Sequence, residues 1–172
     1  MKLQAIVLLF LLLYPTVLLS SSSDVASQGQ TELGVNGRVD LDSDENQNTY
    51  LKVKAGYYVV NDILVGLQVN LGTEDSGLRE SFAPYLELNL GDYWGLSTYV
   101  GAQTKFAKSP AGVSDDRIFI PVFYVGAMYV LVKGVAISSQ LNIELAQDKV
   151  YGESGDRRKT NTQMEIGLRV FL

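Results

Sequence analysis

The last nine residues of the chain alternate strictly between two kinds of side chain. The apolar set comprises Met164, Ile166, Leu168, Val170 and Leu172, and the opposite set comprises Glu165, Gly167, Arg169 and Phe171. Successive side chains of a β-strand point to opposite faces of a sheet. The pattern therefore predicts a strand that lies between an apolar and a polar medium.

The same alternation recurs along the chain and predicts eight strands in all. They are expected over residues 31–39, 51–58, 65–71, 82–90, 96–103, 118–132, 135–145 and 164–172. The stretch 118–132 is apolar on both faces, so its register cannot be assigned, although its β-branched and aromatic content favours a strand. The expected fold class is all-β.

The connections between these strands alternate in length. Those at 60–63, 91–95 and 132–134 are short and carry turn residues, whereas those at 40–48, 73–80, 106–116 and 147–159 are longer and polar. Long connections then lie at one end of an up-and-down meander and both termini at the other. An even strand number, strands about ten residues long and this asymmetry are typical of transmembrane β-barrels.

The N-terminal segment has the features of a secretory signal peptide. Lys2 gives a positive start, 5–19 is an apolar run, and 20–27 is small and polar. We expect cleavage after Ser27, with Val25 and Ser27 as the small flanking residues, although the serine run offers other sites. The alternative is a membrane anchor, but fifteen apolar residues fall short of the roughly 20 that span a bilayer. The expected organisation is a signal peptide over 1–27 and a barrel over 28–172.

Composition excludes several chemistries. The chain has neither cysteine nor histidine, so it lacks disulfides, thiolate metal ligands and an imidazole base. Its net charge of -5 argues against nucleic-acid binding. Asp40 to Asp44 begins like a calcium loop, but Glu45 stands where glycine is needed and Leu51 where a bidentate Glu belongs. We therefore expect no catalytic residues, no metal site and no cofactor.

Aromatic residues gather near the two ends of the predicted strands, as expected at two membrane interfaces. One set comprises Tyr57, Tyr58, Tyr93, Trp94, Tyr129 and Phe171, and the other comprises Tyr50, Phe82, Phe106 and Phe119. With this pattern, the loop asymmetry and the closing strand, residues 29–172 resemble the small eight-stranded outer-membrane barrels of the OmpA transmembrane, OmpX and opacity-protein type. Those proteins usually end in Phe, whereas here Leu172 is last and Phe171 precedes it.

The resemblance implies an outer-membrane location, contact with outer-membrane lipid and lipopolysaccharide, and insertion by the barrel-assembly machinery. It also implies that the polar faces point inward, where an eight-stranded barrel has room only for side chains. The basic residues of those faces are Arg38, Lys52, Lys54, Lys105 and Arg169, and the acidic ones are Glu32, Asp40, Glu87, Glu144 and Glu165.

Buried charges require partners, so we expect a salt-bridged interior plug. Its expected members are Arg38, Lys52, Lys54, Glu87, Glu144, Glu165 and Arg169, with Gln68, Gln103, Gln140 and Asn142 completing the hydrogen bonds. The alternative is that these charges form an ion-conducting gate.

One long connection carries a compact basic group, Arg157, Arg158 and Lys159, at the expected outer rim. It could contact the phosphates of lipopolysaccharide, or it could be an ordinary solvated charge cluster.

The leading function is a non-enzymatic outer-membrane scaffold for structure, adhesion or surface interaction, with a host or surface ligand held by four long loops. Two alternatives stay open. One is a small porin-like channel. The other is a soluble secreted barrel of lipocalin type, with its apolar face turned inward around a ligand.

Overall fold

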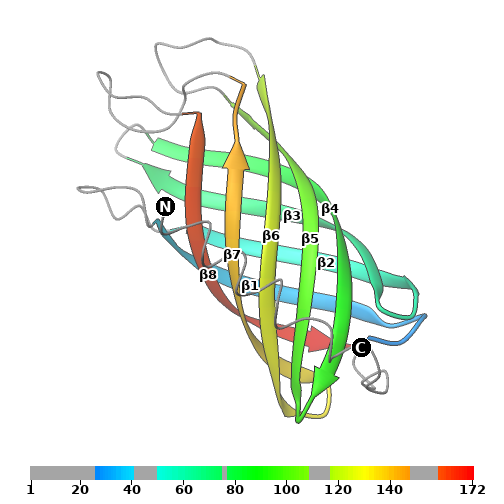
Figure 1. Ribbon diagram of the computed structural model, residues 1–172. Coiled ribbons are helices and arrows are strands. Elements are labelled where there is room, and N and C mark those ends of the chain that lie inside the picture. Colours follow the sequence, from blue (N-terminus) through cyan, green and yellow to red (C-terminus); the bar gives the residue numbers. More distant parts are fainter. Residues whose placement is uncertain (1–25, 41–49, 75–76, 109–116, 148–158) are drawn as a thin grey trace, which may run out of the picture.

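The computed structural model describes residues 26–40, 50–74, 77–108, 117–147 and 159–172. Eight strands follow one another around a closed barrel, each antiparallel to its neighbours, and β8 pairs with β1 to complete the ring (Figure 1). The strands are β1 (Thr31–Asp40), β2 (Tyr50–Val60), β3 (Ile63–Glu74), β4 (Gly77–Tyr93), β5 (Leu96–Lys108), β6 (Arg117–Val132), β7 (Val135–Leu145) and β8 (Thr160–Phe171). The predicted all-β, up-and-down, eight-stranded barrel is confirmed.

Tight turns connect β2 to β3, β4 to β5 and β6 to β7, and we call this end of the barrel the short-turn end. Asp62, Trp94, Gly95 and Gly134 adopt positive φ in these turns. At Gly134, with φ 80°, glycine is the residue that takes this conformation without strain. The short connections are where the sequence placed them.

The strands β3 and β4 extend further than the alternation indicated. The predicted loop 73–80 is wrong over most of its length, because Thr73 pairs with Leu78 and Glu74 with Gly77. Residues 73–74 and 77–80 continue the ladder in spite of their largely polar character. Similarly, β5 runs on to Lys108, which pairs with Arg117. A polar residue ends the apolar alternation without ending the strand, since backbone pairing does not depend on what the side chain faces.

The two faces of the barrel wall are inverted relative to a soluble protein. Large aliphatic side chains point outward and are exposed, for example Leu86 and Ile166 at 53% each. Charged side chains point inward and are buried, including Glu32, Glu87 and Arg169 at 0%. The closing strand follows this rule, because Glu165 and Arg169 are buried on the side opposite Ile166.

The structure supplies the register of β6 that the sequence left open. Val122, Tyr124 and Met128 are buried inside the barrel, whereas Phe123 and Tyr129 are exposed outside. The strand is apolar on both faces because its inward positions hold Ile120, Val122, Tyr124 and Met128, none of which is charged.

Aromatic side chains are divided between the outer wall and the interior. Tyr57, Trp94 and Tyr129 are exposed at the short-turn end, but Tyr58 and Phe171 are buried inside, so the interface ring expected there is smaller. Their positions in the period-two pattern put both on the inward face.

Near the other end, Phe82, Phe106 and Phe119 form a continuous outer cluster across β4, β5 and β6. The Phe82 and Phe106 ring centroids are 4.9 Å apart, and those of Phe106 and Phe119 are 5.3 Å apart. The described part of the chain contains no helix with the length and apolar character needed to cross a bilayer.

Candidate functional site

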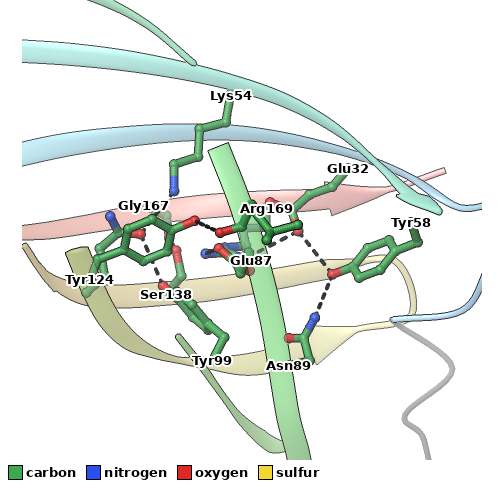
Figure 2. Close-up of polar contacts among 12 residues, drawn as sticks. Glu32, Lys54, Tyr58, Glu87, Asn89, Tyr99, Tyr124, Ser138, Gly167 and Arg169 are labelled. Carbon is green, nitrogen blue, oxygen red and sulfur yellow. Dashed lines mark hydrogen bonds and ion pairs between the residues drawn. The ribbon is translucent and has the colours of Figure 1, made fainter. Parts of the chain in front are cut away.

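Arg169 of β8 is a fully buried cation in the interior. Its Nη1 donates to Glu87 Oε1 at 2.5 Å and its Nη2 to Glu87 Oε2 at 3.2 Å, while Nη1 also reaches Glu32 Oε2 at 3.2 Å (Figure 2). All three side chains are fully buried. A guanidinium that holds one carboxylate with two parallel bonds fixes orientation as well as charge. Arg169 therefore ties β8 to β4 and β1 across the lumen.

Polar and aromatic groups complete the surroundings of this triad. The Tyr58 hydroxyl donates to Glu32 Oε2 at 3.3 Å, and Asn89 Nδ2 donates to the Tyr58 oxygen at 3.3 Å (Figure 2). The guanidinium carbon of Arg169 lies 4.1 Å from the centroid of the Tyr99 ring. A desolvated cation over an aromatic face gains roughly 2 kcal/mol.

A second cluster is centred on Glu165, also on β8. The Glu165 carboxylate forms an ion pair with Lys52 and accepts hydrogen bonds from Asn142 Nδ2 at 2.5 Å and Asn36 Nδ2 at 3.2 Å. These partners come from β1, β2 and β7. Glu165 thus joins the two ends of the sheet where the barrel closes.

Lys54 lies between the two clusters. Its Nζ donates to Gln140 Oε1 at 3.0 Å, and Gln140 Nε2 donates to Asn142 Oδ1 at 2.7 Å. The Lys54 ammonium also lies 5.3 Å and 5.1 Å from the ring centroids of Tyr85 and Tyr124. A continuous chain of hydrogen bonds therefore runs from Lys54 to the Glu165 cluster.

A third ion pair lies toward the long-loop end. Lys105 Nζ is 3.3 Å from Glu144 Oε1, and the Lys105 side chain is 15% exposed whereas that of Glu144 is 1% exposed. This pair is closer to solvent than the two clusters, so its net contribution to stability is smaller.

Three tyrosines lie flat against the inner wall, each over a glycine of the neighbouring strand. Tyr85 faces Gly66, Tyr124 faces Gly101 and Tyr99 faces Gly126 in the strand register. A Cβ added at any of these glycines would collide with the facing tyrosine ring.

Two of these tyrosines also reach the strand on the far side of the glycine-bearing strand. The Tyr124 hydroxyl donates to the Leu86 carbonyl, and the Tyr99 hydroxyl donates to the Ser139 carbonyl, both at 3.4 Å. Each ring therefore lies across one strand and bonds to the next, which fixes the relative position of three strands.

An apolar layer fills the interior at the short-turn end. It consists of buried side chains that include Tyr58, Leu64, Met128, Ala136 and Phe171. Ala26, which precedes β1, belongs to the same cluster. The sequence pattern did not reveal this layer, because its members alternate with outward apolar residues and give no polar signal.

The structure places the expected plug residues as follows. Lys52, Lys54, Glu87, Glu144, Glu165 and Arg169 are all buried in the interior. The backbone of Arg38 belongs to β1, but its side chain lies outside the described part of the structure, as do Arg157, Arg158 and the centre of the calcium-like segment. Lys159 is described and exposed.

Several residues of the network were not singled out from the sequence. These are Asn36, Tyr85, Asn89, Tyr99 and Tyr124, whereas Tyr58 was expected in the aromatic set at a membrane interface and not in the interior. A usable signal existed for Tyr85, Tyr99 and Tyr124, because each stands on the inward face opposite a glycine, but it appears only once the strand register is known.

The polar groups of the described interior are bonded mainly to one another. The buried carboxylates that hold hydrogen bonds here are engaged by cations or amides of the protein itself. Within the described residues, no group of three or more acidic, histidine or cysteine side chains is arranged to hold a metal ion. The arrangement is suited to cross-linking the barrel wall.

No protein-family model and no curated protein matches the chain. Its fold defines the class of small closed antiparallel barrels, and solved structures of that class match it. The N-terminal β-barrel domain of OprF from Pseudomonas aeruginosa has a TM-score of 0.61 and 15% identity, over 84% of this chain and 98% of that one.

Two further structures show the same likeness. Neisserial surface protein A matches with a TM-score of 0.56 and 13% identity over 82% of this chain and 94% of that one. A de novo designed transmembrane β-barrel matches with a TM-score of 0.57 and 15% identity, over 85% of this chain and 98% of that one. The resemblance to small eight-stranded outer-membrane barrels is therefore confirmed at the level of the fold.

Proposed function

We propose that the chain is a non-enzymatic integral outer-membrane β-barrel that serves as a structural, adhesion or surface-interaction scaffold. The observation that carries the proposal is the inversion of the wall. Outward residues such as Leu67, Leu86 and Ile166 are about half exposed, while ion pairs occupy the interior. Monomeric soluble proteins rarely expose a contiguous apolar surface of this kind. A bilayer is the medium in which such a surface is favourable.

The same inversion opposes the lipocalin alternative. A soluble ligand-binding barrel needs an apolar interior around its ligand, but here the middle of the lumen holds Arg169, Glu87 and Glu165. Moving these ions away from water costs several kcal/mol each and is compensated only by the partners that they now have. An apolar ligand could not replace those partners.

The filled lumen opposes the porin-like alternative. The Arg169 triad and the Glu165 cluster cross the middle of the barrel, and the layer formed by Leu64, Met128 and Phe171 occludes the short-turn end. Conduction would require both the charge network and the apolar layer to open. We therefore favour a stabilising plug over an ion-conducting gate.

Recognition is then left to the long-loop end. Expected contacts there are outer-membrane lipid and lipopolysaccharide, with a host or surface ligand bound by the loops, and insertion would depend on the barrel-assembly machinery. The likeness of the fold to OprF and Neisserial surface protein A supports an outer-membrane barrel, and these contacts are what such a location would bring.

The experiment is membrane fractionation combined with electrophoresis of unboiled and boiled samples. We expect the protein in the outer-membrane fraction, with a mobility that changes on boiling because the closed barrel resists detergent until it is heated. A protein in the soluble fraction with one mobility would refute the proposal. Planar-bilayer recording of the refolded protein is expected to show no steady conductance, and regular open channels would favour the porin-like alternative.

A further inference from the structure

The outer wall of the barrel has a hollow across β4, β5 and β6, which lie side by side (Figure 1). Its volume is about 410 Å³, and its lining includes Leu86, Leu88, Val100, Ala102 and Phe123. Leu86 pairs with Ala102, and Ala102 pairs with Phe123. Leu86 and Phe123 are 53% and 54% exposed. The hollow exists because a small side chain on the middle strand lies between two large ones.

The two ends of this hollow differ. On the side of the long loops, the outer cluster of three phenylalanines described above spans the same three strands and bounds the hollow. On the side of the short turns, Gly91 pairs with Thr98, and Thr98 pairs with Ala127. All three of these residues are small, so the hollow continues toward the short-turn end. Trp94 and Tyr129 are exposed near that end, at 86% and 50%.

The width of the hollow limits what can occupy it. Neighbouring strands are about 4.8 Å apart, so the flanking side chains stand on strands roughly 10 Å apart. These side chains take up part of that distance, and the remainder accommodates one hydrocarbon chain but not an α-helix, whose diameter is about 10–12 Å. A second barrel also fits poorly, because two convex walls meet along a line, whereas stable interfaces bury more than about 1,000 Å².

From this geometry we propose that the hollow binds one acyl chain of a glycerophospholipid from the membrane leaflet at the short-turn end. The inference rests on the proposed function, which places lipid against the wall. The chain enters past Thr98, lies between Leu86 and Phe123, and ends at the outer phenylalanine cluster. Binding is favoured by the apolar surface that both partners remove from water or detergent. Trp94 and Tyr129 belong to the residue types that lie at the level of lipid headgroups.

The test is native mass spectrometry of the full chain, refolded in detergent and incubated with dipalmitoyl phosphatidylethanolamine. We expect one lipid bound to each wild-type barrel. Ala102→Phe fills the middle of the hollow, so the bound fraction should fall roughly tenfold or more. Val53→Phe is the matched control, because Val53 is an exposed residue of the wall that pairs with Val35 and Val69 in a row of equal side chains. This control should bind lipid as the wild type does.

Ala102→Leu repeats the measurement with a side chain that the wall already carries, in case the larger ring impairs folding, and it should also lower the bound fraction. Equal binding by the wild type and both Ala102 variants would overturn the proposal. An equal loss in Val53→Phe would do the same, since it would indicate unspecific contact with the wall. Dimers of the wild type that Ala102→Phe dissociates would assign the hollow to a second copy instead.

These outcomes concern the hollow alone, because they are measured on purified protein. A protein found in the soluble fraction of the cell would contradict the proposed function itself, so the two failures are distinguishable.

Discussion

Arg169 and Glu87 face each other across the lumen and form two hydrogen bonds, 2.5 Å and 3.2 Å long, although 82 residues separate them in sequence. The pair links β8 to β4, on opposite sides of the closed sheet (Figure 1). Ladder hydrogen bonds hold each strand only to its neighbours, so this contact adds a cross-brace that the backbone cannot provide.

Replacing Arg169 should therefore be costly. In Arg169→Met the carboxylates of Glu32 and Glu87 lose their shared cation, and breaking such a buried network costs about 3–5 kcal/mol. Urea unfolding of the refolded protein in lipid vesicles measures this loss. The triple variant Arg169→Met, Glu32→Gln, Glu87→Gln removes the charges together and should recover much of the stability. If the single and triple variants were equally unstable, the loss of charge pairing would not explain the lower stability of Arg169→Met.

The two remaining acidic positions should differ in cost. Glu165 holds Lys52, Asn36 and Asn142, so Glu165→Ala should lower the free energy of unfolding by about 3–5 kcal/mol. Glu144→Ala affects a pair whose lysine is partly exposed, and about 1–2 kcal/mol is expected. The midpoint of the heat-induced mobility shift should fall in the same order. No change for either variant would contradict a stabilising plug.

The tyrosine–glycine contacts predict a steric effect. Gly101→Ala places a methyl group against the ring of Tyr124 and should destabilise the barrel by about 1–3 kcal/mol. Gly37→Ala is the control, since the nearest atom to its added Cβ is the Ile166 carbonyl oxygen at 3.9 Å. Adding Tyr124→Leu to Gly101→Ala should restore part of the loss, and a double-mutant cycle of unfolding free energies measures the coupling. A coupling of zero would show that ring and glycine act independently.

A charge on the outer wall tests the medium that surrounds it. Leu86→Arg should cost about 2–4 kcal/mol if the position lies near the centre of a bilayer, whereas a surface substitution in water is nearly neutral. Gln147→Arg, at an exposed position beyond β7, serves as the control and should have little effect. Unfolding in vesicles compares the two, and equal stabilities would argue against a lipid-facing wall.

The basic group at the expected outer rim gives a binding prediction. Arg157→Ala combined with Arg158→Ala should reduce the amount of protein retained on immobilised lipopolysaccharide, because two guanidinium contacts to phosphate are lost. Lys159→Ala alone should reduce retention less. Unchanged retention of the double variant would contradict a lipopolysaccharide contact and would favour an ordinary solvated charge cluster.

Period-two alternation was sufficient to predict the strand number, because it depends on side-chain direction alone, and the connection lengths predicted the up-and-down topology. Alternation did not decide which face points inward, and that expectation came from the resemblance to outer-membrane barrels. Alternation was also insufficient where a residue's role depends on a neighbouring strand. Tyr124 and Gly101 are far apart in sequence, and only the β5–β6 register makes them partners. The extension of the β3–β4 hairpin was not predicted. Its residues are polar, as in a loop, and yet they continue the strand pairing beyond the apolar part of the wall.

The charge pairs within the site were likewise beyond the sequence. The inward positions of Lys52 and Lys54 follow from alternation, but their partners do not. Lys52 binds Glu165, whereas Lys54, two residues later, bonds to Gln140 and lies between two tyrosine rings. The tilt of the strands relative to the barrel axis determines which inward side chains lie at the same depth in the lumen. This tilt cannot be obtained from a single sequence.

The interior ion pairs also have a consequence for the proposed location of the barrel in a bilayer. Among the described residues, four carboxylates (Glu32, Glu87, Glu144 and Glu165) are balanced by four cations (Lys52, Lys54, Lys105 and Arg169) within the wall. A folded barrel with this balance carries no net internal charge and needs no accompanying counter-ions. In the proposed membrane location, the interior side chains would therefore add no net charge to the part of the barrel that lies within the bilayer.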